Sequence, residues 1–344
     1  MAFQNENVDI NSLYYEGYYN NILLSVTIEL LTECNWRCKH CYIPHHDSYG
    51  MTKEVIFKLF KDLRNMGTMN ITFTGGEIFL RKDIFEIIEK ARDMYFRVYL
   101  FSNASLLNEE MIRKLSELYI SQYSMTVFSL EAEIHDFITG IKGSLEKTLS
   151  NIELLQKYKI PLEIKTPLMD INKFSFIRLK EFCDKRNITY GATTNIFSKS
   201  DGNQSPKELS IAEDDLVKVL KELNKIEDNS RILGEETTNE CCPLLKFILS
   251  IDSNGDVFPC KSLYYKVGNI LEQSVYDIWN FSTDLESIKN MTKKCLNECN
   301  KCDLLEFCHH CLGSALLENG AMNKCDLLAR RNAKAQKIIA QYEN

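Results

Sequence analysis

The chain has 344 residues, of which 44% are hydrophobic and 26% are charged, and this composition predicts a globular protein of two units rather than a disordered or collagen-like chain. Its net charge of −7 and the absence of a dense Lys/Arg run argue against nucleic-acid binding. The most apolar stretches, 22–31 and 244–251, are too short to span a membrane, and the first residues carry no secretory signal. We therefore expect a cytoplasmic protein with no nucleic-acid or membrane partner.

Short β-branched or apolar runs alternate with longer amphipathic stretches from residue 22 to about residue 197. This alternation is typical of repeated βα units around a parallel sheet, in an α/β protein. Six strands are predicted, at 23–30, 70–74, 97–101, 122–128, 161–167 and 188–194. Amphipathic helices are predicted between them, for example at 53–66, 83–94 and 108–118.

A polar stretch at 198–208 predicts a linker after the sixth unit. Ser210 and Glu213 form an S-x-x-E pattern that predicts a capping box and a helix running towards residue 225. Two alternating runs within 248–260 are joined by Asn254-Gly255, which predicts a hairpin, and a last helix is expected at about 326–342. We thus divide the chain into a lead-in (1–21), a βα region (22–197), a linker with a bridging helix (198–235) and a C-terminal module (236–344).

Thirteen cysteines are the main chemical signal, because a reducing cytosol does not sustain a disulfide framework. Three of them, Cys34, Cys38 and Cys41, follow the first strand as C-x3-C-x2-C, and nine fall between residues 241 and 325. We infer two metal-binding regions. The three thiolates of the first region suit one iron-sulfur cluster with one iron left open, since a complete cluster usually has four protein ligands. Zinc, with a nearby histidine as fourth ligand, is the alternative.

The segment 34–42, CNWRCKHCY, resembles the cluster loop of the radical S-adenosylmethionine (radical SAM) enzymes. Thr74-Gly75-Gly76-Glu77, at the end of the second strand, resembles the family's GGE motif, which holds the amino group of the methionine moiety. The resemblance implies a partial (β/α)6 TIM-like barrel that binds S-adenosylmethionine, with Ser129 and Glu131 at the ribose and carboxylate of the nucleoside. The other cofactor contacts that it implies are His40, beside the adenine, Tyr42 and Asn103.

The remaining cysteines form the pattern C-x12-G-x4-C, gap, C-x2-C-x5-C-x2-C, gap, C. This pattern resembles the SPASM extension of radical SAM enzymes, although its last short spacing is x2 where x3 is usual. The resemblance implies a C-terminal cysteine-rich iron-sulfur module with two auxiliary 4Fe-4S clusters. One would be held by Cys299, Cys302, Cys308 and Cys325, and the other by Cys242 (or Cys241), Cys260 and Cys311. The fourth ligand of the second cluster is left open between Cys295, the Cys241-Cys242 pair and none. A structural zinc ribbon is the alternative.

The resemblance implies reductive cleavage of S-adenosylmethionine to a 5′-deoxyadenosyl radical that abstracts a hydrogen atom from substrate. We expect an enzyme that oxidatively modifies a ribosomally made peptide, by a thioether, carbon-carbon or related crosslink or by another residue oxidation. The alternatives are an enzyme of tetrapyrrole or other cofactor biosynthesis, a formylglycine-forming sulfatase maturase, which the Lys261 that follows Cys260 disfavours, and a non-enzymatic electron carrier.

The expected partners are the peptide and a flavodoxin- or ferredoxin-type reductant. Because the first strand is expected near residue 22, no leader-binding domain fits before it. A leader would then be bound by the barrel, by the second module or by a separate leader-binding protein.

Overall fold

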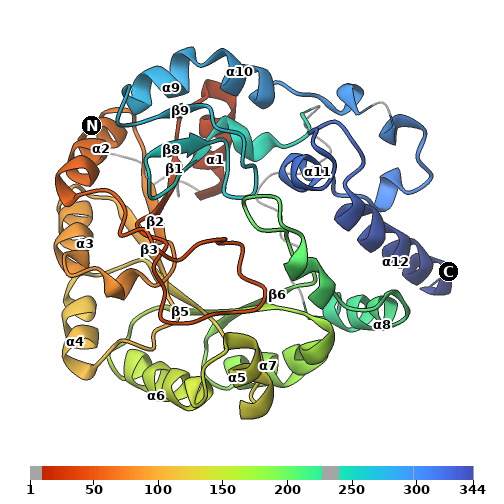
Figure 1. Cartoon of the computed structure of the whole chain (residues 1–344), viewed down its shortest axis with the longest axis horizontal. Helices are drawn as coiled ribbons and strands as arrows, with labels where there is room; N and C mark the ends of the chain where they lie inside the picture. Colours follow the sequence, from red (N-terminus) through yellow and green to blue (C-terminus); the bar gives the residue numbers. More distant parts are fainter. Residues whose placement is uncertain (1–9, 227–239, 297, 344) are drawn as a thin grey trace, which may run out of the picture.

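The computed structural model of the protein describes residues 10–226, 240–296 and 298–343 (Figure 1). Its centre is a nine-stranded sheet in the order β6-β5-β4-β3-β2-β1-β7-β8-β9. The first six strands are parallel and curve into a partial barrel with helices on its outside, so the predicted fold class is confirmed (Figure 1). These six strands are β1 (Ser25–Glu29), β2 (Asn70–Thr74), β3 (Arg97–Phe101), β4 (Gln122–Thr126), β5 (Leu162–Pro167) and β6 (Thr189–Thr193).

Each predicted strand is present, and its bounds either agree with the prediction or differ from it by one or two residues. The described α-helices of the barrel half are α1 (Ile10–Asn20), α2 (Lys53–Asn65), α3 (Ile84–Asp93), α4 (Glu109–Glu117), α5 (Ala132–Thr139), α6 (Ser144–Lys157) and α7 (Ser175–Asp184). Those that follow are α8 (Glu213–Leu223), α9 (Val275–Phe281), α10 (Thr283–Lys289), α11 (Leu312–Asn319) and α12 (Leu327–Glu343). The predicted hairpin is formed by β7 (Ile248–Ile251) and β8 (Asp256–Phe258), and β9 (Gly268–Asn269) pairs with β8.

The predicted capping box at the start of α8 is wrong. The residue before the first turn is Ala212, which has no side chain able to cap, and Ser210 instead ends the short 3₁₀ helix at Ser205–Leu209. That 3₁₀ helix lies within the predicted linker and is followed by two extended residues, so the chain reaches α8 two residues later than the S-x-x-E pattern requires. The first turn of α8 still carries Glu213, Asp214 and Asp215, whose charges favour a helix N-terminus.

The C-terminal part shares its sheet with the barrel. Strand β7 pairs in parallel with β1, in a register that sets Ser25 opposite Ile248 and Ile28 opposite Ile251. Leu249, Ile251 and Val257 belong to the same buried apolar cluster as the barrel strands. The hairpin therefore holds the cysteine-rich part against the barrel at the strand that leads into the first cysteine loop.

Candidate functional site

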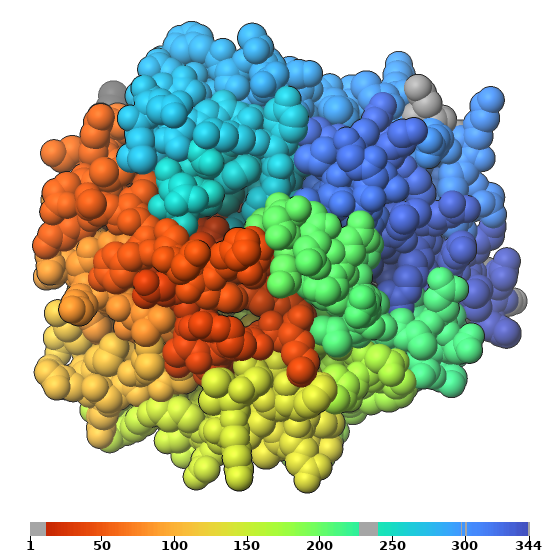
Figure 2. Space-filling model, in the orientation of Figure 1, coloured from red at the N-terminus to blue at the C-terminus, as the bar shows by residue number. Residues whose placement is uncertain are grey.

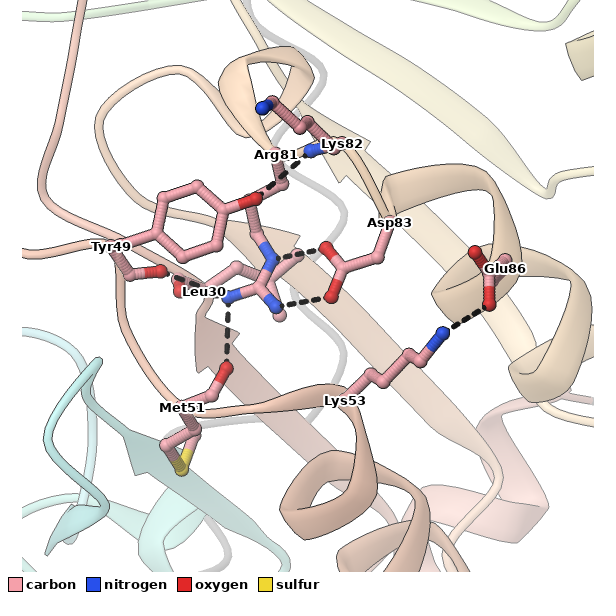
Figure 3. A network of polar contacts seen from close by, with 8 residues as sticks. All are labelled: Leu30, Tyr49, Met51, Lys53, Arg81, Lys82, Asp83 and Glu86. Atoms are coloured by element: carbon pink, nitrogen blue, oxygen red, sulfur yellow. Dashed lines mark hydrogen bonds and ion pairs between the residues drawn. The ribbon is translucent and has the colours of Figure 1, made fainter.

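The first cysteine loop runs from the end of β1 to the start of α2, and one buried arginine binds both of its ends (Figure 3). The guanidinium Nη1 of Arg81 donates to the carbonyl of Leu30 at 3.1 Å and to those of Tyr49 and Met51 at 3.0 Å each. Its Nε and Nη2 bind both oxygens of Asp83, at 2.9 and 2.8 Å. Because Leu30 and Met51 are the two ends of the loop, Arg81 fixes its span. Sequence reasoning missed Arg81, which stands four residues after Glu77.

The two glycines after β2 let the loop lie directly on the strand ends. A Cβ on Gly76 would lie 2.0 Å from the carbonyl oxygen of Glu33, and one on Gly75, whose φ is +146°, would lie 2.3 Å from that of Leu31. The backbone N–H of Gly76 donates to the Leu31 carbonyl at 3.0 Å. The absence of a side chain at both positions therefore lets the cysteine loop approach the end of β2 closely.

Cys34, Cys38 and Cys41 line one cavity of about 220 Å³ together with Gly75 and Gly76. Burial raises the pKa of the Cys34 thiol to about 11, and Cys41 adds to this shift. Burial also raises the pKa of Cys38, with further contributions from Cys41 and Cys34, so the three thiols are electrostatic neighbours. A cationic metal centre would favour their deprotonated form, because a metal ligand must be a thiolate.

His40, Tyr42 and Asn103, predicted as cofactor contacts, line the same cavity. Burial lowers the pKa of His40 to about 4, its ring packs against Phe128 with centroids 5.0 Å apart, and its buried Nδ1 has no hydrogen-bond partner among the described residues. Such an orphaned nitrogen fits a site that a polar ligand completes. Asn103 is fixed by donation from its Nδ2 to Asn35 at 2.9 Å.

Glu77, the acid of the GGE motif, is fully buried and is not part of the cavity wall. Its carboxylate accepts hydrogen bonds from the Phe79 amide at 3.0 Å, the Ser102 hydroxyl at 2.7 Å and the Asn103 amide at 2.8 Å. Burial raises the pKa of this carboxyl, and the three donors oppose the shift. Glu77 thus ties the end of β2 to the end of β3 and sets the position of Asn103.

Ser129 and Glu131, also predicted as cofactor contacts, are not among the residues that line the cavity. Ser129 is buried and its hydroxyl accepts from the Glu131 amide and from the Ser175 hydroxyl, each at 3.1 Å. Glu131 forms an exposed ion pair with Arg178 at 3.2 Å. In this structure both residues organise the start of α5, beside the cavity rather than within it.

Lys165 on β5 lines the cavity, and sequence reasoning did not single it out. Its Nζ lies 3.2 Å from a Glu163 oxygen and 4.5 Å from the centre of the Phe101 ring. The available signal was a Glu-x-Lys alternation within a strand that is otherwise apolar at alternate positions.

Seven of the nine cysteines of the second region fall into two groups by their electrostatic influence on one another. Burial raises the pKa of Cys260 to about 12, with contributions from Cys242 and Cys311. The other predicted set is also brought together, because burial raises the pKa of Cys308 to about 11 and Asp326, Cys299, Cys302 and Cys325 add to it. Short 3₁₀ turns carry this second set, at Cys299–Lys301 and Leu305–Phe307.

Cys241 has several thiol neighbours, because Cys295, Cys242 and Cys299 all contribute to its raised pKa. Burial raises the pKa of Cys241 to about 11, and the largest thiol contribution comes from Cys295. The pKa of Cys242 is raised by burial and by Cys311, with no contribution from Cys295. The fourth ligand of the cluster held by Cys242, Cys260 and Cys311 therefore stays a prediction, with Cys295, the Cys241-Cys242 pair and none as its alternatives.

A polar network connects the two cysteine regions. Glu29, at the end of β1, accepts from the Tyr42 hydroxyl at 2.9 Å and from Lys261 Nζ at 2.7 Å. Tyr42 follows Cys41 and Lys261 follows Cys260, and the Lys261 ammonium lies 4.5 Å from the centre of the Tyr42 ring. Beside the network is a cavity of about 110 Å³ whose wall includes Tyr264 and Ser198.

Within the described ranges, no three His, Cys, Asp or Glu side chains are placed to hold a single metal ion. Cys34, Cys38 and Cys41 instead line one cavity, and thiolates are the ligands that iron-sulfur clusters use. No helix in the same ranges is long and apolar enough to cross a membrane.

Comparison with known families identifies both regions. The Radical SAM superfamily matches residues 28–185, and the SPASM iron-sulfur cluster-binding domain matches residues 241–303. The chain belongs to the radical SAM superfamily. The match to the SPASM domain stops short of Cys308, Cys311 and Cys325, although the structure brings these three cysteines to the groups just described.

This radical SAM protein is 24% identical over 322 residues to the AdoMet-dependent heme synthase of Methanosarcina barkeri, and the alignment covers 85% of this chain and 92% of that protein. It is 26% identical over 278 residues to the sporulation killing factor maturation protein SkfB of Bacillus subtilis, covering 77% and 67% of the two chains. Streptococcus suis SuiB, solved with its precursor peptide SuiA, superposes with a TM-score of 0.72 at 14% identity, over 96% of this chain and 84% of SuiB. The likeness to SuiB is one of fold.

Proposed function

We propose that this radical SAM enzyme oxidatively modifies a ribosomally made peptide, by forming a crosslink or by oxidising a residue. The observation that carries the proposal is the cavity that Cys34, Cys38 and Cys41 line together with His40, whose buried Nδ1 has no hydrogen-bond partner among the described residues. Two of the similar proteins, SkfB and SuiB, are by name a maturation protein and a protein bound to its precursor peptide.

The three thiolates of the loop would hold a 4Fe-4S cluster with one open iron, to which S-adenosylmethionine binds. When bound, the cluster and S-adenosylmethionine supply one-electron reduction and hydrogen-atom abstraction. The chain's own residues position these groups. Arg81 fixes the loop, Gly76 lets the loop pack on β2, and His40 offers a neutral ring nitrogen, because its pKa of about 4 lies well below neutral pH.

In the second region, Cys299, Cys302, Cys308 and Cys325 would hold one auxiliary cluster with four thiolates. Cys242, Cys260 and Cys311 would hold the other with three, which leaves one of its irons without a protein thiolate. The Glu29–Lys261–Tyr42 network would fix the spacing of the two regions, since Tyr42 follows Cys41 and Lys261 follows Cys260.

The test is co-expression with each short peptide encoded beside the gene, followed by mass spectrometry of the peptide. We expect the peptide to lose two hydrogen atoms for each crosslink formed, and we expect the Cys38→Ala variant to leave its mass unchanged. An unchanged peptide with the wild-type enzyme, under conditions in which the enzyme cleaves S-adenosylmethionine, would contradict the peptide assignment.

A second candidate is an enzyme of tetrapyrrole biosynthesis. It is favoured by the similarity to the M. barkeri heme synthase, which extends over 92% of that protein. Anaerobic incubation with an iron porphyrin precursor and S-adenosylmethionine distinguishes the two candidates, because heme formation is read directly from the absorbance spectrum and needs no peptide.

A further inference from the structure

A second cavity, of about 570 Å³, lies where the chain enters α8 beside the first turns of α12. These two helices lie side by side at the edge of the molecule, far from α2 and α3 (Figure 1). Four cations line the cavity, Lys207, Arg330, Arg331 and Lys334, against one carboxylate, Glu213. This cavity takes no part in the site described above.

Two of the four cations are already engaged. Lys207 forms an ion pair with Glu318, and Arg331 donates to the backbone carbonyl of Ile211. Arg330 and Lys334 are exposed, and within the part of the chain that the structure describes neither forms an ion pair with a carboxylate. The cavity therefore has uncompensated positive charge at its surface.

The cavity adjoins the larger cysteine group. The Arg330 guanidinium is hydrogen-bonded to the thiol of Cys325, which belongs to that group. Arg330 thus contacts a cysteine of the group on one side and lines the cavity on the other. Leu327, 48% exposed, and Leu328 add an apolar wall.

The segment around this group differs in charge from the rest of the protein. Residues 293–337 contain eight Lys and Arg against five Asp and Glu, whereas the whole chain has a net charge of −7. A positive area on a negative protein gives an acidic partner one favoured place to bind, because complementary charge steers encounter and orientation.

We propose that this cavity is the docking site of a small acidic electron carrier of the flavodoxin type, which exchanges electrons with the cluster held by Cys299, Cys302, Cys308 and Cys325. The carrier loses one electron and the cluster gains it, or the reverse. The inference rests on the proposed function in that it requires this cluster. An electron carrier needs a short path to a redox group and only a small interface, both of which this surface offers.

The first test uses the wild-type holoenzyme and photoreduced flavodoxin in anaerobic stopped-flow mixing, at rising ionic strength. Two proteins of net negative charge repel, so without a local site salt would accelerate electron transfer. Docking at the cavity predicts the opposite sign, with a rate constant that falls as salt is added. A rate that rises with salt would overturn the proposal.

The second test compares Lys334→Glu with Lys58→Glu, a matched charge reversal of an exposed lysine on α2, across the molecule (Figure 1). At low ionic strength Lys334→Glu should slow reduction by flavodoxin severalfold and lose its salt dependence, while Lys58→Glu should behave as wild type. Reduction by dithionite should be equal in all three proteins, which shows that the clusters are intact. Equal rates of reduction by flavodoxin in all three proteins would overturn the docking site. An acidic peptide that binds the cavity without slowing electron transfer from flavodoxin would overturn it as well. Absence of dithionite-reducible iron in the wild type would instead contradict the proposed function.

Discussion

The two cysteine regions are built in different ways. The first loop is held by buried groups of the barrel, with Arg81 at both of its ends and Gly76 packed beneath it, and the space-filling view shows it covering the mouth of the barrel (Figure 2). The larger cysteine group of the second region stands on 3₁₀ turns of three residues, one of which, Leu305–Phe307, buries none of its residues. We therefore expect packing to organise the first site before a cluster binds, and cluster binding to be needed to organise the second.

The largest expected effect is the loss of the first cluster. Cys38→Ala removes a direct ligand, so the reconstituted enzyme should lose about four irons, one 4Fe-4S cluster, and should form no 5′-deoxyadenosine from S-adenosylmethionine. Because the barrel holds the loop, the far-ultraviolet circular dichroism spectrum of Cys38→Ala should match that of the wild type. The control is Cys183→Ala, which removes a thiol buried in the core and should change neither iron content nor cleavage. Cleavage that survives in Cys38→Ala would refute the assignment of the first group.

Cys308→Ala tests the other side of the comparison. It should remove about four irons as well, but here we also expect local unfolding, seen as rapid proteolysis between residues 290 and 326 of a protein whose barrel remains resistant. Cleavage of S-adenosylmethionine should persist while modification of the substrate stops. Protection from protease equal to that of the wild type would show that packing, and not the cluster, holds this region.

Arg81→Met sharpens the claim that the first loop is preorganised. The change leaves three loop carbonyls and the Asp83 carboxylate without their partner, and breaking such a buried pair costs about 3 kcal/mol or more of unfolding free energy. We expect weaker binding of S-adenosylmethionine, measured by calorimetry, in addition to lower stability. Arg113→Met, which breaks an exposed helical pair with Glu117, is the control and should have little effect on either. If Arg81→Met bound the cofactor normally, the loop would not depend on this anchor.

A last expected effect concerns the contact between α10 and the start of the barrel. Burial lowers the pKa of Lys289 from 10.5 to about 7, and its ammonium lies over the Trp279 ring and 3.1 Å from the Asn21 side chain. Between these two pKa values the unfolded chain binds more protons than the folded one, so stability should rise with pH from about 7 and level off near 10. Thermal melts across this pH range should show the rise in stability for the wild type and not for Lys289→Met. Parallel pH profiles would show that Lys289 titrates normally.

Most of the fold could be predicted from the sequence, because the evidence for it is local. Strands β2 and β3 begin and end at the predicted residues, since a buried strand alternating with amphipathic helices has a clear period. The cysteine spacings likewise predicted both cysteine regions, which the family comparisons support. The predicted capping box was wrong because a four-residue pattern does not determine the backbone conformation of the residues that precede α8.

Only the tertiary structure decided how the regions meet. The parallel pairing of β7 with β1 joins residues more than 200 positions apart, and no local pattern encodes such a partner. The same long-range contact brings Lys261 to Glu29. The meeting of β2 with β3 is likewise why Glu77 ties two strands together instead of lining the cavity. Residue types and their spacings determined which cofactor chemistry the sequence predicts. Burial and distance determined which side chains surround the site, because both depend on segments that meet only when the sheet forms.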